Sequence, residues 1–398
     1  MLRVVCAHNF YRSEVPSGEN QVVIGEQRLL RKCGHDVFEY RTISDALVAR
    51  GIAGAIYAAS ITPWNPWVAQ SIRRKVDELK PDIVHIHNTF PLLSPSIFHA
   101  IGHRAARVLT LHNYRIYCPA AIPMRNGTVC TECLDKRSPL PSILHGCYRQ
   151  SRAATLPLAI NVGLHRFLGT WTSEVDAFIC LSDFQRELMV RAGLPRDKVH
   201  VKPNFHPGSP DVLPWHERNP YAVFVGRLSE EKGVVNLLRA WQAWGANAPE
   251  LRVVGDGPLR AELERMSSGL PVRFLGQLPA EQAQAEIARA RLQILPSECY
   301  ETFGLVVVEA FAHGTPAAVS DLGPLPSIVA HGRSGIVFQP ANPQSLLGEV
   351  RTAWETPGLL ETLGKGARAE FDSKYTEEAN YTMLMNIYEQ AIEVSRNG

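Results

Sequence analysis

Short apolar runs alternate with longer amphipathic stretches along most of the chain. A short apolar run bounded by turn residues is typical of a buried strand, whereas apolar positions three and four residues apart indicate a helix. In the first half, the runs expected to form strands cover residues 2–7, 35–40, 81–87, 108–112, 175–181 and 199–202. Strands that alternate with helices predict a parallel sheet covered on both faces.

The same alternation returns in the second half, after a stretch rich in proline. Residues 206–219 combine Pro207, Pro210 and Pro214 with polar residues, which is typical of a linker between domains. We therefore expect a first domain over residues 1–205 and a second over residues 220–376, which makes the fold class α/β. The terminal residues 377–398 have helical periodicity.

Candidate chemistry is concentrated in the second domain, where an apolar run over residues 292–295 is followed by polar residues and then by an apolar helix. Gly304 opens this helix, and the free N–H groups of a first helical turn favour an anion such as a diphosphate. Glu301 precedes the helix and Glu309 lies near its second turn. Both carboxylates can therefore accept hydrogen bonds from the hydroxyls of one ligand.

Two glutamates separated by seven residues around Phe-Gly-Leu resemble the signature of retaining glycosyltransferase family 4. The resemblance implies the GT-B fold, in which two doubly wound, Rossmann-like domains face a central cleft and the last helix crosses back to the first domain. It also implies that Glu309 holds the ribose hydroxyls and Glu301 the hexose of a nucleotide sugar. Phe303, Gly304 and Leu305 are expected to lie against the donor.

A second signature follows the expected strand at residues 221–225. An Arg and a Lys at one strand-to-helix turn can neutralise a diphosphate leaving group without a divalent metal. The run Val-Gly-Arg-Leu-Ser-x-x-Lys-Gly is similar to the family pattern, and it makes Gly226, Arg227 and Lys232 donor ligands. No catalytic metal is expected.

Weaker features fit the same resemblance. Gly18 occupies the place of a glycine-rich loop, although many members carry two adjacent glycines there, and an ordinary turn glycine remains the alternative. Gly257 and Leu278 follow strands of the second domain and are expected near the nucleotide. His112 ends the strand-like run of residues 108–112 in a Thr-Leu-His-Asn motif, where the family uses the His to contact the transferred sugar; His85 and His87 are weaker candidates.

Composition and charge narrow the function classes. The 398 residues are 45% hydrophobic and 20% charged, with a net charge of +2, so nothing suggests a nucleic-acid partner. No signal-peptide pattern follows Met1, so we expect a cytoplasmic protein with mostly reduced cysteines. Residues 151–171 are expected to cover the core as a helix, although a peripheral element at the cytoplasmic face of the inner membrane is also possible.

The strand–helix pattern is interrupted at about residues 114–150, where four of the eight cysteines lie. Four thiolates around a structural zinc ion would stabilise such a polar insertion. The candidate ligands, with His145 as a substitute for one of them, are Cys118, Cys130, Cys133 and Cys147. The alternative is that these are ordinary reduced cysteines.

The most probable function from sequence is transfer of a hexose from a UDP- or GDP-linked donor to a saccharide or lipid-linked saccharide, with retention at the anomeric carbon. Synthesis of a bacterial surface polysaccharide such as lipopolysaccharide is the expected setting. The candidate catalytic residues are His112, Arg227, Lys232 and Glu301. A sugar-nucleotide epimerase or hydrolase, or a non-catalytic sugar-nucleotide-binding protein, remains the alternative, because fold alone does not decide function.

Overall fold

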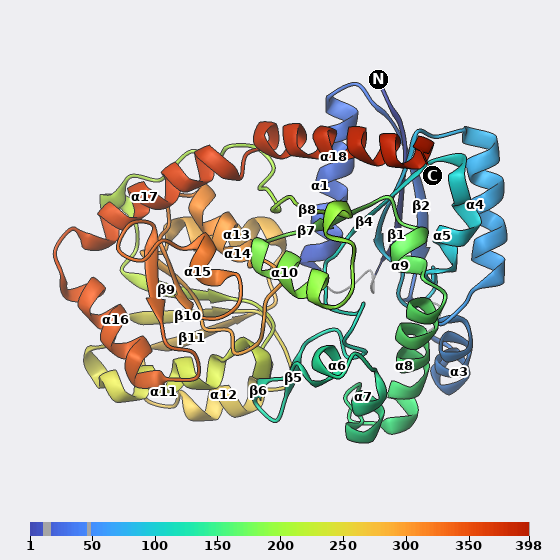
Figure 1. The fold of residues 1–398 in the computed structure, drawn as a ribbon. Coiled ribbons are helices and arrows are strands. Elements are labelled where there is room, and N and C mark those ends of the chain that lie inside the picture. The colour runs from blue at the N-terminus through green and yellow to red at the C-terminus, as the bar shows by residue number, and fades with distance from the viewer. Residues whose placement is uncertain (11–16, 46–48, 398) are drawn as a thin grey trace. The chain divides into compact units, whose positions relative to one another are not determined.

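The computed structural model describes residues 1–10, 17–45 and 49–397, in two compact units (Figure 1). Unit 1 comprises Met1–Pro123, Cys130–Pro203 and Asn380–Gly398, and unit 2 comprises Met124–Val129 and Asn204–Ala379. Gly18, which occupies the place of the expected glycine-rich loop, is described, but residues 11–16 before it are not.

Unit 1 contains a six-stranded sheet in which every strand pair is parallel. The strands, in spatial order, are β2 (Asp36–Ile43), β1 (Arg3–Phe10), β3 (Ile83–Asn88), β4 (Ala106–Thr110), β7 (Ala177–Cys180) and β8 (Val199–Val201). The central strands β1, β3, β4 and β7 are almost wholly buried, as a sheet covered on both faces requires. His112 lies two residues beyond β4 rather than within a strand.

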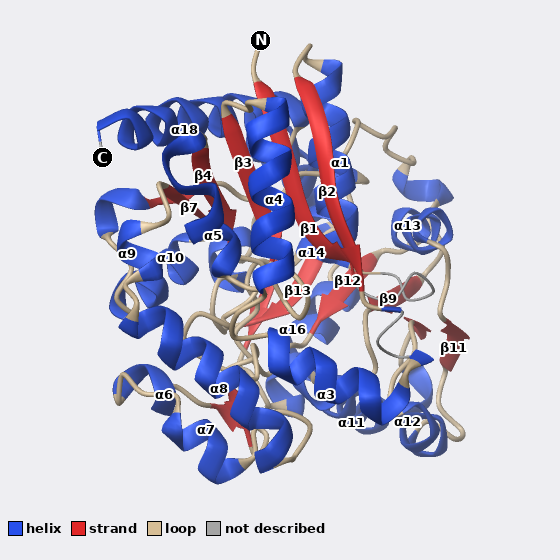
Figure 2. Ribbon diagram, turned by 90° about the vertical axis from the view of Figure 1, so that its right-hand side faces the viewer, coloured by secondary structure: helices blue, strands red, loops and turns tan. Residues whose placement is uncertain are grey.

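Helices cover both faces of this sheet, as Figure 2 shows for α1 and α4. They are α1 (Gly18–Lys32), α3 (Gly51–Ile61), α4 (Pro66–Leu79), α5 (Ser96–Ile101), α8 (Arg152–Phe167), α9 (Thr170–Ser173), α10 (Asp183–Arg191) and most of α18 (Glu377–Asn397). From α18, Leu384, Ile387 and Tyr388 join the core cluster that β1, β3, β4 and β7 form. The last helix of the chain therefore completes the hydrophobic core of unit 1.

The insertion between β4 and β7 has secondary structure that the pattern of the sequence did not reveal. It contains the short antiparallel hairpin β5 (Met124–Arg125) and β6 (Thr128–Val129), followed by α6 (Glu132–Asp135) and α7 (Leu140–His145). Elements this short carry too few periodic positions to be recognised in a sequence. No described helix of the chain has both the length and the apolar character that crossing a bilayer requires.

Unit 2 has a second six-stranded parallel sheet. Its strands, in spatial order, are β11 (Val272–Gly276), β10 (Glu250–Val254), β9 (Tyr221–Val225), β12 (Leu292–Leu295), β13 (Ala317–Ser320) and β14 (Gly335–Phe338). Its helices are α11 (Val234–Trp244), α12 (Arg260–Met266), α13 (Ala280–Arg289), α14 (Leu305–Ala312), α15 (Leu325–Ile328), α16 (Pro343–Glu355) and α17 (Leu359–Lys374). The predicted α/β fold with two Rossmann-like sheets is confirmed.

The strand order of unit 2 reverses between β9 and β12, because the chain moves outward from β9 to β11 on one side and from β12 to β14 on the other. Open α/β sheets bind ligands beyond the carboxyl ends of the strands at such a switch point. The turns that follow β9 and β12 contain the two predicted signatures. The topology thus brings together segments about 70 residues apart in the sequence, which is the separation of Lys232 and Glu301.

These two turns touch through their backbones. Gly233 has φ +66°, and a Cβ built on it would lie 1.9 Å from the carbonyl oxygen of Pro296. The amide of Glu298 also donates to the carbonyl of Glu231 at 2.9 Å. Only a residue without a side chain permits this approach, so Gly233 fixes Lys232 against the turn that follows β12.

Gly233→Ala should therefore destabilise unit 2 beyond the cost of an unfavourable φ. The clash with backbone forces a shift, for which overpacking costs of about 1–3 kcal/mol are typical. Gly332→Ala is the matched control, since Gly332 has φ +74° and no atom within 4 Å of its built Cβ. Chemical denaturation of both variants measures the difference. Equal losses of stability would contradict the assigned contact.

Candidate functional site

Lys232 and Glu301 form an ion pair at the switch point of unit 2. Lys232 Nζ donates to Glu301 Oε1 at 2.6 Å, and Ser297 Oγ donates to the same oxygen at 2.5 Å. Burial by itself lowers the pKa of Lys232, but the attraction of Glu301 outweighs it and raises that pKa. Burial likewise acts to raise the pKa of Glu301, and Lys232 outweighs it. Both side chains are therefore charged at neutral pH.

Arg227 follows β9 directly and is exposed. Within the described residues its guanidinium has no ion pair or hydrogen bond, in contrast to Lys232. Arg227 can therefore bind an anionic ligand directly. Lys232, in the same turn, must first exchange Glu301 for the ligand. Arg227 can bind a phosphate through two parallel hydrogen bonds.

The other glycine-containing turns of unit 2 pack against the turn that follows β9. A Cβ at Gly255 would lie 2.0 Å from the carbonyl oxygen of Gly226, and one at Gly257 would lie 2.4 Å from that of Leu228. Leu278, after β11, is half-buried against the apolar cluster around Tyr221. The backbone of Gly226 and Gly257 therefore lies at the ligand-binding edge, whereas the side chain of Leu278 serves packing.

The helix α14 begins at this edge, where Gly304 with φ +111° precedes it. No side chain caps its N-terminus, so the amide of Leu305 in its first turn receives no capping hydrogen bond from a side chain, as is typical of a helix N-terminus that binds an anion. Phe303 is buried and its ring lies 6.0 Å from that of Tyr375. The side chain of Phe303 thus anchors the turn, and its backbone supplies the contact surface.

Glu309 is an unpaired acid on α14. Its carboxylate has no hydrogen-bond or ion-pair partner among the described residues, and burial raises its pKa to about 7. A half-buried carboxyl group with a raised pKa and no partner, at the carboxyl edge of a parallel sheet, is a typical feature of functional sites. The stabilising partner would be a ligand that donates hydrogen bonds.

In unit 1, His112 is held by His87. The two rings are stacked with centroids 5.4 Å apart, and His87 Nδ1 lies 3.1 Å from His112 Nε2. Burial lowers the pKa of His87 to about 4 and places that of His112 well below its ordinary value, so both rings are neutral at pH 7. His87 ranked below His112 as a site residue in the sequence, yet it positions His112.

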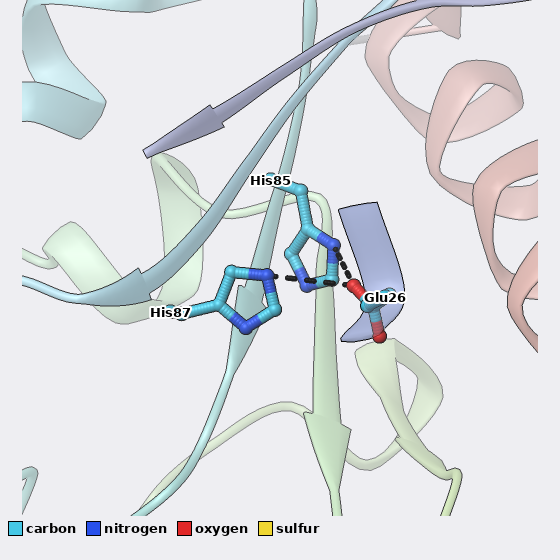
Figure 3. Close-up of side chains that lie close together, drawn as sticks. All are labelled: Glu26, His85 and His87. Carbon is cyan, nitrogen blue, oxygen red and sulfur yellow. Dashed lines mark ion pairs between the residues drawn. The ribbon is translucent and has the colours of Figure 1, made fainter. Parts of the chain in front are cut away.

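Glu26 lies behind this pair, and Figure 3 shows the imidazoles of His85 and His87 turned toward its carboxylate. Glu26 Oε1 lies 3.0 Å from His85 Nδ1 and 3.4 Å from His87 Nε2, and Lys202 Nζ donates to Glu26 Oε2 at 2.9 Å. Burial acts to raise the pKa of Glu26, but Lys202 and His85 outweigh it and hold that pKa well below its usual range. This carboxylate remains ionised and orients the two imidazoles.

The contact with Glu26 also favours one position of the proton on His87. A carboxylate only accepts, so the proton of neutral His87 lies on Nε2, and its Nδ1 accepts from His112 Nε2. His112 then presents Nδ1 as an acceptor.

Glu26, His85 and His87 could in principle bind a metal ion. Among the described residues they are the only group of three or more whose potential ligand atoms all lie within 4.8 Å of one another. However, the ammonium of Lys202 already neutralises Glu26, and both nitrogens of His85 have partners, namely the hydroxyls of Tyr388 at 2.9 Å and Thr110 at 2.7 Å. We therefore interpret the group as a buried ion network that positions His87 and His112.

A second acid of unit 1 lies at this edge without any recognisable signal in the sequence. Glu19, in the first turn of α1, has a pKa that burial raises to about 8, although Arg115 and Asn88 nearby act to lower it. One oxygen of Glu19, Nδ2 of Asn88 and Nε of Arg115 are buried without a hydrogen-bond partner among the described residues. Such groups are rare in native proteins and suggest an absent ligand or water. Glu19, Asn88 and Arg115 lie in separate turns and form no motif in the sequence, so they could not be predicted.

His112 lines a small cavity of about 50 Å³ together with Asn88 and Arg115. Asn88 ends β3, His112 and Arg115 follow β4, and Glu19 lies in the first turn of the helix after β1, so the polar groups gather at the carboxyl edge of the sheet in unit 1. Gly18 begins α1 beside them and is exposed. These side chains offer both hydrogen-bond donors and hydrogen-bond acceptors, so they can bind the hydroxyl groups of a ligand.

All four cysteines of the insertion are free thiols near one another. Burial raises the pKa of Cys118 to about 12, with contributions from Cys133 and Cys147. Burial also raises the pKa of Cys133 to about 11, with contributions from Cys147 and Cys130. The sulfur atoms do not form a group within 4.8 Å among the described residues. The zinc site stays a prediction.

Comparisons with known proteins agree with this geometry. Residues 21–206 match the family described as Glycosyltransferase Family 4, and residues 208–370 match Glycosyl transferases group 1. Sulfoquinovosyl transferase SQD2 of Arabidopsis thaliana is 33% identical over 341 residues, which cover 81% of this chain and 59% of that protein. The chain spans less than two thirds of the length of the first curated relatives that it matches.

Solved structures match almost the whole chain. Anabaena Alr3699/HepE in complex with UDP-glucose has a TM-score of 0.67 at 16% identity, over 98% of this chain and 100% of that one. Sucrose-phosphate synthase of Thermosynechococcus elongatus has a TM-score of 0.69 at 18% identity, over 98% of this chain and 99% of that one. These likenesses identify the fold as GT-B, and the two family matches, which follow one another along most of the chain, place this protein in glycosyltransferase family 4.

Proposed function

We propose that this protein is a retaining hexosyltransferase. It transfers a hexose from a UDP- or GDP-linked donor to a saccharide or lipid-linked saccharide at the cytoplasmic face of a membrane, in the synthesis of a bacterial surface polysaccharide. The observation that carries the proposal is the grouping of Lys232, Glu301 and the N-terminus of α14 at the switch point of unit 2. Family membership and the complex of HepE with UDP-glucose give it further support.

The donor diphosphate binds between fixed positive groups. Arg227, which has no partner of its own within the described part of unit 2, receives the phosphate oxygens, and the amides that begin α14 bind them from the other side. Negative charge develops on the phosphate as the glycosidic bond breaks, so preorganised donors stabilise the transition state more than the ground state. This arrangement requires no divalent metal ion.

Lys232 exchanges its partner during this step. Before the donor binds, Lys232 holds Glu301 at 2.6 Å. A diphosphate is the stronger anion, so it competes for the ammonium and leaves the carboxylate of Glu301 able to accept hydrogen bonds from the hexose. The ion pair thus keeps both groups charged and positioned in the absence of the donor, which reduces the cost of reorganisation on binding.

Glu309 binds the ribose. Two neighbouring hydroxyls can donate to its two carboxylate oxygens, and this bidentate contact favours the ionised form of an acid that burial otherwise keeps partly protonated. In unit 1, His112 accepts a hydrogen bond from the transferred sugar through Nδ1, and Glu19, Asn88 and Arg115 bind hydroxyls of the sugar or of the acceptor.

The proposal is tested by incubating the purified chain with UDP-glucose or GDP-mannose and with saccharide or lipid-linked acceptors, and by following the anomeric configuration of the product. Acceptor-dependent transfer with retention is expected. Interconversion of the donor without an acceptor would indicate an epimerase, release of free sugar a hydrolase, and saturable binding without any turnover a sugar-nucleotide-binding protein; each would refute the transferase.

Arg227→Ala and Lys232→Ala should each lower turnover about 100- to 1,000-fold, as is typical when one preorganised donor to a developing anion is lost. Arg273→Ala is the control, because Arg273 is an exposed arginine of unit 2 outside the predicted site. Steady-state kinetics of the three variants give the comparison. Turnover near that of the wild type in both site variants, with the fold intact, would contradict the roles assigned to them.

Donor affinity should depend on pH through Glu309. Because bound ribose favours the ionised carboxylate and the free group has a pKa of about 7, binding releases a proton and weakens as the pH falls below 7. Between pH 8 and 6 the affinity should fall by up to about tenfold. Calorimetry with UDP-glucose and GDP-mannose is suitable, since the diphosphate of a nucleotide sugar does not titrate in this range.

Two variants test whether Glu309 causes the pH dependence of donor affinity. Glu309→Gln should bind the donor more weakly and with a smaller dependence on pH than the wild type, the remainder arising from Glu19, whose pKa is about 8. Glu301→Gln should retain the full pH dependence and mainly lose turnover. The same pH dependence in wild type and Glu309→Gln would show that another group titrates.

We also propose that the four cysteines of the insertion bind a structural zinc ion. The presence of four free, partly buried thiols in one short polar insertion supports it, since a structural zinc ion takes four such ligands. Elemental analysis of protein purified without a metal-binding tag should find about one zinc per chain, and Cys130→Ser with Cys133→Ser should lose it and melt at a lower temperature. Cys33→Ser, at an exposed cysteine of α1's C-cap, is the control.

If wild-type protein contains no zinc and the double variant melts like the wild type, the cysteines have no metal-binding role. Activity after dialysis against a chelator separates this ion from catalysis: transfer should persist as long as the insertion remains folded.

A further inference from the structure

Three adjacent helices of unit 1 carry large apolar side chains on the outside. In both ribbon views α8 lies between α7 and α3, and α8 packs against each of them (Figures 1 and 2). Their exposed apolar residues, together with Trp67 at the start of α4, are here called the outer apolar face: Ile52, Ile56, Trp67, Leu140, Leu144, Leu156, Ile160 and Phe167. None of them belongs to the sites described above.

The spacing of these residues places them on one side of each helix. On α8, Leu156, Ile160 and Phe167 follow at intervals of four and seven, opposite the buried positions such as Leu158 and Val162. Ile52 and Ile56 on α3, and Leu140 and Leu144 on α7, are each four residues apart. Each helix therefore has an exposed apolar stripe, and on α8 this stripe lies opposite the one that faces the core.

The helix α3 is the most unusual of the three. It contains no charged residue, yet most of it is exposed, and Ile52 is 82% accessible to solvent. A helix that is apolar all round is normally buried in a protein or in a lipid phase. Tyr57 contacts Trp67 with ring centroids 6.4 Å apart, so aromatic residues with polar groups border this helix, as is common at a membrane interface.

The segments that carry the outer apolar face are basic, and Glu132 of α6, which lies 3.3 Å from His145 of α7, is an acid in contact with them. Residues 46–76 and 136–173, which include α3, α7 and α8, contain no Asp or Glu, although the chain as a whole has 39 acidic and 41 basic residues. Their basic residues are Arg50, Arg73, Arg74, Lys75, Lys136, Arg137, Arg149, Arg152 and Arg166. Of these, only Lys136 forms an ion pair with a carboxylate in the part of the chain that the structure describes.

We propose that the outer apolar face docks onto the surface of a bilayer that contains anionic lipids. Apolar side chains enter the acyl boundary, and the arginines bind phosphate groups of the lipids. Charge disfavours a second copy of this chain as the occupant, because a two-fold interface would bring arginines against arginines. No described helix is able to cross the bilayer, so α3, α7 and α8 lie on its surface. The proposal does not depend on transferase activity.

Sedimentation of the full chain with vesicles provides the test. Vesicles of phosphatidylcholine with phosphatidylglycerol should bind the protein, vesicles of phosphatidylcholine alone should bind it much less, and high salt should weaken binding. Arg152→Glu with Arg166→Glu should reduce binding at least about tenfold, because each basic residue near an anionic surface contributes measurably. Ile160→Ser with Phe167→Ser should reduce binding to a similar extent.

Matched controls lie elsewhere on unit 1. Arg28→Glu on α1 and Val394→Ser on α18 change exposed residues outside the outer apolar face and should bind like the wild type. Circular dichroism and melting temperature confirm that each variant is folded.

Three results would overturn the proposal. They are a wild type that sediments with neither kind of vesicle, face variants that bind as well as the controls, and a change in oligomeric state with the face variants in the absence of lipid. The last would identify the surface as a protein interface.

Discussion

The candidate donor site depends on contacts between backbones that side chains would prevent. At Gly233 the turn after β9 approaches the carbonyl of Pro296 in the turn after β12, and at Gly255 the turn after β10 approaches Gly226. Close packing of three strand-to-helix turns leaves their amides and charged side chains at one edge of the sheet. These contacts bring Lys232 and Glu301, which are 69 positions apart in the sequence, close enough to form their ion pair.

The polar edge of unit 1 is organised by charge rather than by backbone contact. Glu26 is buried in α1 and is surrounded by Lys202, His85 and His87. Burying a carboxylate is costly unless several partners compensate it, and here they do. The same partners orient His87, and through it His112. A residue inside a helix, far from any motif, thus influences the orientation of His112 through His87.

Much of the fold could be predicted from sequence because long periodic segments carry strong signals. The strand at residues 221–225 and the helix at 377–397 were recognised in this way. The short elements α6 and α7 were missed, since a single turn shows no periodicity. Signature residues such as Lys232 and Glu301 were found, but their ion pair was not, because pairing depends on which strands are neighbours. Glu19 and Glu26 lacked any local signal.

The helix α18 has a consequence for the order in which this chain folds. From Asn380 onward it follows all of unit 2 in the sequence, yet its Tyr388 closes the core of unit 1 and bonds to His85. Asn380 also accepts from Lys202 at 3.1 Å. During synthesis, unit 1 emerges first but lacks these partners until its last segment has been made. The contiguous segment of unit 2 can fold before then, so the half of the protein that is synthesised first is the half that is completed last.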